Sequence, residues 1–418
     1  MTTRPGAEPP ALLRVEDHLA RVLAEIEPLS PLDLMLGEAH GCVLTDDVVA
    51  RVDVPAFDNS AMDGYAVRLP DVAAATDTTP VTLPVIGDIP AGSVAAYRLQ
   101  PGATARIMTG APLPAGAEAV VPVEWTDAGV ASVAIRRAPA EGQYVRRQGE
   151  AVTAGQVVLT AGTRLGPAQV GLAAAVGHDR VAVRPRPRVV VLSTGSELVS
   201  PGGRVAPGQI TDSNSAMLAA AAKECGAIAY NVGAVPDEPR ILLDAIEDQL
   251  IRADVIVTSG GVSAGAYDVV KEVLGRTGTV RFDRIAMQPG MPQGFGTLGP
   301  DRTPIFTLPG NPVSAYVSFE VFVRPVLRRM LGVRPLNRPT VPAVCEEPFP
   351  SPEGKRQYAR GRLELRDGGY VVRPVGGAGS HLVGDLAHAN ALIVVPEAVT
   401  AVPRGGTVTV MVLERRAS

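Results

Sequence analysis

The chain has 418 residues, of which 46% are hydrophobic but only 4% aromatic, so we expect about two to four domains with mainly aliphatic cores. A net charge of -4, without a basic stripe that carries interleaved aromatic residues, excludes nucleic acid as an expected partner. The sequence has no apolar run near the ~20 residues of a membrane span and no leader-like apolar segment after its first residues. Its three cysteines, Cys42, Cys225 and Cys345, form no CxxC motif. We therefore predict a cytoplasmic protein with no membrane contact and with buried thiols, rather than a disulfide framework or a zinc site.

The first part of the chain predicts a helix followed by a β-rich module. Apolar residues recur at helical spacing over residues 15–26, and Pro28 then closes the segment. Residues 48–150 alternate short apolar runs with Pro and Gly turns, which is typical of a β-rich domain inserted into its neighbour. Residues 151–184 indicate a strand, a turn and a small helix that return to the N-terminal helix region, because so short a piece cannot form a core by itself. We expect residues 1–47 and 151–184 to form one elongated domain.

A regular alternation of strands and helices begins at residue 185. The expected strands cover residues 189–192, 227–232, 254–258, 279–286 and 305–308, and the expected helices cover 212–223, 236–252, 267–274 and 312–331, the last with a kink at Pro325. This alternation predicts an α/β domain over residues 185–332, with a parallel-rich sheet and helices on both faces. Residues 333–418 contain short strands and Gly turns and predict a small C-terminal β-barrel or sandwich.

Four polar loops follow the expected strands, where ligands sit in open parallel sheets. They are STGSE (193–197), VPDE (235–238), SGGVSAG (259–265) and LPGNP (308–312). We expect one crevice to collect Glu197, Asp237 and Asp268 beside these turns. The candidate ligand-binding residues of the turns are Ser259, Gly260, Gly261, Ser263, Gly265, Pro309, Asn311 and Pro312.

The chemistry of this crevice indicates a phosphorylated small molecule and a divalent cation. Gly-rich turns that feed helix N-termini present free N–H groups to an oxyanion, and nearby carboxylates suit Mg²⁺ bridging to it. Such a metal would polarise a phosphoanhydride for attack. SGGVSAG matches neither the dinucleotide-binding motif GxGxxG nor the P-loop motif GxxxxGK[ST]. The sequence therefore gives little support for a dinucleotide-binding protein or a P-loop nucleotidase. Each feature also has a simpler explanation. SGGVSAG suits an ordinary tight turn, Glu197 and Asp237 suit solvated loop acids, and Asp268 suits an acid at a helix N-terminus.

Polar clusters outside this domain give weaker signals. The segment VPAFDNSAMDGYAV (54–67) carries Asp58, Asn59, Ser60 and Asp63, and two ordinary turns would explain it equally well. RIMTGAPLP (106–114) combines an arginine with Thr109 and a Gly turn, which suits an anion or a plain turn. In KRQYARG (355–361) and GAGSH (377–381), Arg360 and Ser380 are candidates for binding an oxyanion, and a basic surface loop is the alternative.

Six motifs occur together and in one order: FDNSAMDGYAV, RIMTGAPLPAGAEAVVPVE, VRRQGE, STGSEL, SGGVSAGxxD and LPGNPVSA. As a set they resemble the MoeA family and the related C-terminal domain of gephyrin, over essentially the whole chain. The resemblance implies a four-part protomer that forms a homodimer. It also implies an active-site cleft where the molybdopterin-binding α/β domain of one chain faces the DNSAMDG module of the other.

The reaction implied by the resemblance is the transfer of molybdenum to molybdopterin. Adenylyl-molybdopterin and molybdate are the substrates, Mg²⁺ assists, AMP leaves and the dithiolene receives molybdenum. Molybdopterin adenylyltransferase and molybdoenzyme chaperones are expected partners. Carried over by motif, Asp63, Glu197, Asp237 and Asp268 are catalytic, the last three hold the metal, and a further set binds substrate or shapes its loops. That set comprises Asp58, Asn59, Ser60, Thr109, Arg284, Arg360 and Ser380 together with the turn residues named above.

The chain departs from the family pattern at a few positions. Ala151 stands where an acid is frequent, Ser196 replaces the first acid of STGDEL, and Arg284 and Gln288 stand where lysines are usual. These departures keep a second reading open, a non-catalytic molybdopterin-binding scaffold paralogue of the same fold. A third reading is a molybdopterin adenylyltransferase-like or nucleotide pyrophosphatase activity, which would not need the DNSAMDG module or the C-terminal barrel.

Overall fold

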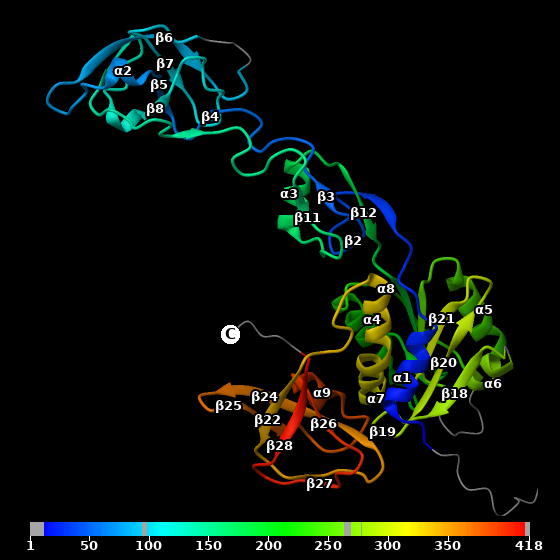
Figure 1. Ribbon diagram of the computed structural model, residues 1–418. Coiled ribbons are helices and arrows are strands. Elements are labelled where there is room, and N and C mark those ends of the chain that lie inside the picture. The colour runs from blue at the N-terminus through cyan, green and yellow to red at the C-terminus, as the bar shows by residue number, and fades with distance from the viewer. Residues whose placement is uncertain (1–11, 94–97, 263–268, 277, 414–418) are drawn as a thin grey trace, which may run out of the picture. The chain divides into compact units, whose positions relative to one another are not determined.

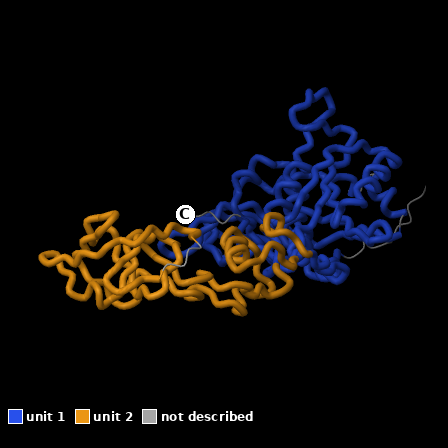
Figure 2. The backbone as a smooth tube through the Cα atoms, turned by 90° about the horizontal axis from the view of Figure 1, so that it is seen from above, with its two compact units in different colours: residues 1–32, 41–43, 184–418 blue, residues 33–40, 44–183 orange. Residues whose placement is uncertain are grey.

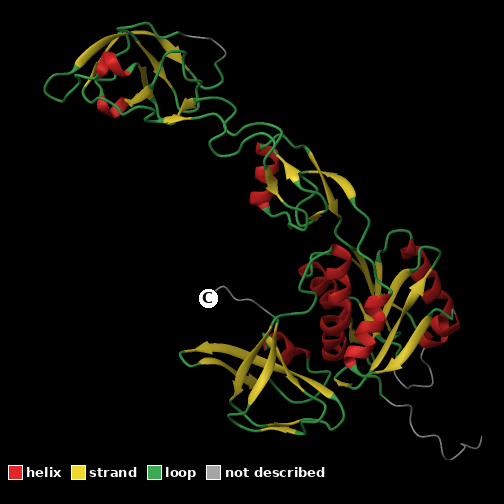
Figure 3. Ribbon diagram, viewed as in Figure 1, coloured by secondary structure: helices red, strands yellow, loops and turns green. Residues whose placement is uncertain are grey.

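The computed structural model describes residues 12–93, 98–262, 269–276 and 278–413 (Figure 1). By their internal contacts the described residues form two compact units (Figure 2). Unit 1 comprises residues 1–32, 41–43 and 184–418, and unit 2 comprises residues 33–40 and 44–183. Most of the helices surround the large sheet of unit 1 (Figure 3). The finer division into four domains stays a prediction.

The centre of unit 1 is a six-stranded sheet in the order β16-β13-β17-β21-β20-β18. Its strands are β13 (Arg188–Thr194), β16 (Ile228–Val235), β17 (Val255–Ser259), β18 (Val280–Arg284), β20 (Pro292–Leu298) and β21 (Thr303–Leu308). The first four in the order pair in parallel, as predicted, whereas β20 is antiparallel to both of its neighbours. Strand β20 was not predicted. Its short links to β18 and β21 enforce antiparallel pairing, because a parallel connection needs a long crossover.

Helices cover both faces of this sheet, which confirms the predicted architecture. The helices are α4 (Asn214–Glu224), α5 (Pro239–Leu250), α6 (Val269–Arg276), α7 (Pro312–Ser318) and α8 (Arg324–Leu331). In β13, Val189 and Val191 enter a core with residues of α4, α7 and α8, whereas Val190 and Leu192 enter a second core with residues of α5 and α6. Successive side chains of a strand point to opposite faces, so one apolar run serves two cores.

The long helix predicted from Pro312 is irregular in its middle. Between α7 and α8 lies the π-helical segment η2 (Phe319–Val323), and Pro325 follows in the first turn of α8. Proline has no N–H to donate and its ring crowds the preceding turn, so a wider local turn takes the place of a regular one. Gly332 ends α8 in the left-handed conformation, with φ 76°.

The N-terminal helix α1 (Val15–Ala24) lies in unit 1, whereas residues 151–183 lie in unit 2. Its apolar side chains Val15 and Val22, with Ile26 just beyond the helix, join the core formed by the sheet and α8. Helical periodicity showed that one face of α1 is buried, but it could not show which partner covers that face.

One buried residue of α1 makes the stability of unit 1 sensitive to pH. Burial lowers the pKa of His18 to about 4, although Asp283, whose Oδ2 lies 3.5 Å from Nδ1, acts in the opposite direction. The unfolded chain binds a proton near the ordinary value of 6.5, so it holds more protons than the folded chain between pH 6.5 and 4. We expect the free energy of unfolding to fall as pH falls through this window, by up to about 3 kcal/mol.

Urea unfolding at pH 7 and pH 5 measures this effect, with His18→Gln as the comparison because glutamine does not titrate. The loss between the two pH values should be smaller in His18→Gln than in the natural protein. An equal loss in both proteins would assign the pH dependence to other groups.

The C-terminal part of unit 1 is a closed barrel, as predicted. Its strands are β22 (Thr340–Cys345), β24 (Arg356–Arg366), β25 (Gly369–Pro374), β26 (Ala391–Val395) and β28 (Thr407–Val412). The order β24-β25-β22-β28-β26 closes through the pairing of β26 with β24. Strand β19 (Met287–Gln288) adds to β24 and connects the α/β part to the barrel.

Unit 2 contains a five-stranded sheet in the order β8-β5-β7-β6-β9, which confirms the β-rich module. Its strands are β5 (Gly64–Val67), β6 (Val81–Ile89), β7 (Thr104–Ile107), β8 (Ala119–Pro122) and β9 (Ser132–Ile135). The remainder of the unit includes β11 (Val157–Leu159), α3 (Pro167–Ala175) and β12 (Arg180–Arg184). These elements return to the N-terminal segment through its strands, since β12 lies between β1 (Leu32–Met35) and β2 (Val43–Leu44), and β11 pairs with β3 (Val48–Val49).

Cys42, Cys225 and Cys345 are all buried thiols, as predicted. Burial also raises the pKa of the Cys225 thiol to about 11. Within the described ranges, none of the helices combines the length and the apolar character that crossing a membrane requires.

Candidate functional site

The predicted crevice exists as a cavity of about 600 Å³ in unit 1. Segments 193–198, 210–214, 259–262 and 309–314 line it, together with Asp237 and Pro292. Segments 193–198, 259–262 and 309–314 follow the carboxyl ends of β13, β17 and β21, where a parallel sheet places its ligands, and segment 210–214 leads into α4. All four predicted loops therefore contribute to one cavity.

Glu197 and Asp237 lie on the wall of this cavity, as predicted. Ser196 connects their loops. The Asp237 N–H donates to Ser196 Oγ at 3.0 Å, and the Ser196 N–H donates to Asp237 Oδ2 at 3.3 Å. Ser196, which stands where the family has an acid, therefore still supplies a hydrogen-bond acceptor between the loops of Glu197 and Asp237.

The third predicted acid, Asp268, lies outside the described residues, as do Ser263 and Gly265. Among the residues that the structure describes, no group of three or more His, Cys, Asp or Glu side chains is arranged to hold a metal ion. Metal binding by Glu197, Asp237 and Asp268 therefore stays a prediction. The structure shows only that Glu197 and Asp237 line the same cavity.

The SGG turn requires glycine where it passes β13. Gly260 has a φ of +104°, and a Cβ at that position would lie 2.4 Å from the Thr194 carbonyl oxygen. Neither the conformation nor the space admits a side chain without strain. Before this glycine, Ser259 Oγ donates to the Pro309 carbonyl at 3.1 Å, so the SGG and LPGNP turns are connected directly.

The LPGNP turn also contacts the GAGSH loop. Asn311 precedes the first residue of α7, Pro312, and its Nδ2 donates to Ser380 Oγ at 2.9 Å. The Ser380 carbonyl accepts from the Val313 N–H at 3.0 Å. Ser380 thus lies beside the LPGNP turn, as its proposed role in substrate binding requires.

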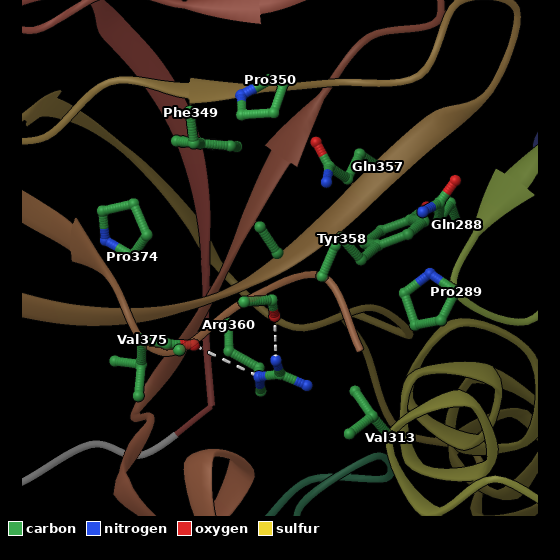
Figure 4. A pocket seen from close by; sticks show the side chains of 14 residues that line it. Gln288, Pro289, Val313, Phe349, Pro350, Gln357, Tyr358, Arg360, Pro374 and Val375 are labelled. Carbon is green, nitrogen blue, oxygen red and sulfur yellow. Dashed lines mark hydrogen bonds between the residues drawn. The ribbon is translucent and has the colours of Figure 1, made fainter. Parts of the chain in front are cut away.

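Arg360 lies in a different cavity, of about 310 Å³, between the α/β part and the barrel (Figure 4). Its guanidinium donates to the carbonyls of Val375, Gly377 and Gly379, with Nε–O and Nη1–O distances of 3.3 and 3.0 Å to the first and the last. In this arrangement the arginine orders the 375–379 loop and offers few donors to a ligand. The predicted oxyanion contact of Arg360 would require that loop to move.

The two positions that lack the usual lysines are separated in the structure. Gln288 lines the cavity that contains Arg360 and is the register partner of Gln357 across β19 and β24. Arg284 is exposed, with Nη2 3.6 Å from Met291 Sδ, and belongs to the lining of neither cavity.

In unit 2 the structure brings Asp63 and Thr109 together. Asp63 Oδ1 accepts from the Thr109 N–H at 2.7 Å and from its hydroxyl at 2.8 Å. The backbone hydrogen bond, followed by the hydroxyl, lowers the pKa of Asp63 below its ordinary value. Both residues are exposed, so an ionised carboxylate and a threonine stand together at the surface.

The other three predicted residues of this segment make internal contacts. Asp58 accepts from the Gln148 N–H at 2.7 Å and from Arg147 Nη1 at 2.6 Å, and these bonds lower its pKa in that order. Asn59 is buried and donates to the Phe57 carbonyl, and the Ser60 hydroxyl donates to the Met62 carbonyl. Two ordinary turns explain these contacts, and substrate binding by Asp58, Asn59 and Ser60 stays a prediction.

Residues 212–215 support the cavity in a way that sequence reasoning did not find. Asp212, predicted only as a helix cap, is buried and accepts from the hydroxyls of Ser193 and Ser215 at 2.8 and 2.5 Å. Asn214 Nδ2 donates to Ser259 Oγ at 2.7 Å and to the Gly310 carbonyl at 2.6 Å. The signal in the sequence was the concentration of small polar residues in TDSNS, directly before a helix.

The fold and the cavity define a multidomain protein with a ligand-binding α/β domain whose site lies at the strand ends. The family model described as "Probable molybdopterin binding domain" matches residues 190–329. The models described as "MoeA N-terminal region (domain I and II)" and "MoeA C-terminal region (domain IV)" match residues 13–177 and 342–413. The chain belongs to the MoeA family.

Known relatives agree over nearly the full length. A protein named molybdopterin molybdenumtransferase 2 from Mycobacterium tuberculosis is 50% identical over 398 residues, which cover 94% of this chain and 97% of that relative. A molybdopterin molybdenumtransferase from Bacillus subtilis is 35% identical, with 88% and 87% covered. A crystal structure of the molybdopterin biosynthesis MoeA protein from Pyrococcus horikoshii has a TM-score of 0.69 at 29% identity, covering 96% of this chain and 100% of that one.

Proposed function

We infer that the chain is a molybdopterin molybdenumtransferase, an enzyme of molybdenum-cofactor synthesis. Relatives with that name occur in several bacteria and align with this chain over most of their length. The observation that carries the inference is the cavity at the strand ends of the molybdopterin-binding domain, where Glu197 and Asp237 meet the SGG and LPGNP turns. Similarity to full-length relatives favours the enzyme over the scaffold reading and over a stand-alone adenylyltransferase.

The substrates that fit this cavity are adenylyl-molybdopterin and molybdate. The Gly260 and Gly261 turn presents backbone to the cavity without a covering side chain, which suits the approach of a phosphate. Asn311 and Pro312 start α7 beside this turn and line the same cavity, so the positive end of that helix adds to the attraction for an anion. The walls bind and orient the phosphoanhydride from which AMP leaves.

Glu197 and Asp237 suit Mg²⁺ because both are carboxylates on one cavity wall, and Mg²⁺ is held by one or two carboxylates together with substrate phosphate oxygens. Asp268 completes the proposed set. A bound Mg²⁺ would neutralise phosphate charge and polarise the phosphoanhydride. The Ser196 N–H donates to the Asp237 carboxylate and helps to orient it, while the Ser196 hydroxyl accepts from the Asp237 N–H and holds the loop.

A homodimer and a cytoplasmic location complete the proposal. Large apolar side chains are exposed on the small strands of unit 2, with Met35, Val49 and Val157 each 40–46% exposed. A second copy of the chain would cover such side chains. In that dimer Asp63 and Thr109 belong to the cleft that the MoeA resemblance implies.

Purified protein supplied with adenylyl-molybdopterin, Mg²⁺ and molybdate should release AMP and form active cofactor. AMP is measured by chromatography, and cofactor by reconstitution of nitrate reductase. Expression in a bacterial strain that lacks this step should restore nitrate reductase activity. A folded protein that neither releases AMP nor complements the strain would support the scaffold reading instead.

A further inference from the structure

One wall of the cavity of about 600 Å³ carries exposed apolar surface. It belongs to the small sheet in which β14 (Leu198–Val199) pairs in parallel with β15 (Ile210–Thr211). Leu198 and Ile210 both line the cavity, and Ile210 is 57% exposed. Removing such surface from water is favourable, so this wall favours a ligand that has an apolar face of its own.

Leu198 and Ile210 form one continuous surface because their strands are in register. Leu198 is the register partner of Ile210, and the Ile210 N–H donates to the Glu197 carbonyl at 2.9 Å. Among the Val, Leu and Ile residues described in the cavity lining, Val262 is only 6% exposed. Leu198 and Ile210 therefore supply most of the accessible aliphatic surface of this lining.

Polar groups border the aliphatic surface on both strands. Glu197 directly precedes Leu198, and Thr211 and Asp212 directly follow Ile210, and all of them line the cavity. A ligand that uses both parts of the wall needs a charged group next to a flat apolar face. A phosphate ester of a heteroaromatic ring has this chemistry, whereas a small free oxyanion leaves the aliphatic surface uncovered.

We propose that Ile210 and Leu198 pack against the face of a heteroaromatic ring of the substrate, while the phosphoanhydride lies beside Glu197 and the SGG turn. The assignment rests on the proposed function, whose substrate carries two such rings, the adenine and the pterin. The chemistry shared by the two is a flat, weakly hydrated ring face attached to a phosphate. Ile210 and Leu198 are then specificity-determining residues, distinct from the acidic residues of the reaction.

Ile210→Ser removes the aliphatic surface without opening a core. Because Ile210 is exposed, thermal stability should change little. Ile210→Leu is the conservative variant, since it keeps an aliphatic side chain at the same place. Val205→Ser is the matched control, because Val205 is 48% exposed in the link between β14 and β15 but lies outside the cavity lining.

Calorimetric titration in the presence of Mg²⁺ uses two ligand pairs, AMP with ribose phosphate, and hydroxymethylpterin phosphate with methyl phosphate. Within each pair the ring is present in one member and absent from the other. In Ile210→Ser the affinity for the ring-bearing member of one pair should fall about five- to tenfold, and the affinity for the ring-free member should not change. Leu198→Ala should act in the same direction. Ile210→Leu and Val205→Ser should keep the natural affinities.

The pair that responds identifies the ring. Unchanged affinity of Ile210→Ser for both ring-bearing ligands would overturn the proposal, and so would equal weakening of both members of a pair. Size-exclusion chromatography tests the other occupant of this surface, a second copy of the chain. A changed oligomeric state in Ile210→Ser, with ring affinity unchanged, would assign Ile210 to an interface between copies and overturn the ring contact.

AMP release from adenylyl-molybdopterin is measured in parallel, so that the two inferences fail separately. If the natural protein releases no AMP but its ring affinity depends on Ile210, the proposed reaction fails and the ring contact is supported. If AMP is released at the natural rate and affinity by Ile210→Ser, the proposed reaction stands and the ring contact fails.

Discussion

Asp237→Asn should lower the rate of AMP release from adenylyl-molybdopterin by on the order of a hundredfold or more. Asp237 lies on the wall of the strand-end cavity with Glu197, and two hydrogen bonds with Ser196 fix its loop. Asparagine keeps the size of the side chain and an oxygen toward Ser196, but it removes the negative charge that a divalent cation requires. The half-saturating Mg²⁺ concentration should rise together with the loss of rate.

Steady-state AMP release across a Mg²⁺ titration measures both effects. Glu197→Gln should behave in the same way, because the second carboxylate lines the same cavity. Asp244→Asn is the matched control, since Asp244 is an exposed acid on α5 outside the cavity lining. Unchanged AMP release and Mg²⁺ dependence in Asp237→Asn would remove this residue from the proposed metal site.

Arg338→Leu should destabilise unit 1 by about 3–5 kcal/mol, because it removes the two close donors of a buried carboxylate and leaves Arg324, whose Nε is 3.9 Å away, as the remaining ion-pair partner. The Glu320 side chain is fully buried, and both of its oxygens accept from the Arg338 guanidinium, at 2.8 and 2.9 Å. Arg338 also donates to Glu224 at 2.7 Å and to the Leu413 carbonyl at 2.6 Å. One side chain thus connects η2, α4 and the end of the barrel.

Urea unfolding of Arg338→Leu against the natural protein gives this free energy directly. The double variant Arg338→Leu/Glu320→Leu should be more stable than Arg338→Leu alone, because it replaces a buried carboxylate that has lost its close donors with an apolar side chain. Arg366→Leu is the control for an exposed pair, since its contacts with Glu346 and Glu364 are at the surface and should contribute little to stability. A loss in Arg338→Leu as small as that in Arg366→Leu would show that Arg324 or a proton compensates Glu320.

The strand-end loops were predictable because their signal is local. Apolar runs that end in STGSE, SGG and LPGNP specify buried strands followed by polar turns, and parallel strands bring their carboxyl ends to one edge. Glu197 and Asp237 could therefore be assigned to one crevice from the sequence, and the structure places both there. The MoeA family motifs, which span both units, predicted the family that the comparisons confirm.

Contacts between distant segments could not be predicted in this way. Asn214 bonds residues that lie 45 and 96 positions further along the chain, and no local pattern records those partners. Arg360 was a candidate for binding an anion by its charge, but folding surrounds its guanidinium with carbonyls of the 375–379 loop. The charge of Arg360 was predictable from the sequence, whereas the carbonyl groups that take up its hydrogen-bond donors were not.

The sequence alone determined which faces of each element are apolar, where strands end, and which loops carry acids. Tertiary structure decided that α1 packs in unit 1, that β20 adds an antiparallel strand, and that Asn214 connects the SGG and LPGNP turns. Periodicity in a sequence encodes the preference of a face for an apolar environment, and a helix face can satisfy that preference against many partners. The choice among those partners depends on shape and hydrogen bonding between segments that only the folded chain brings together.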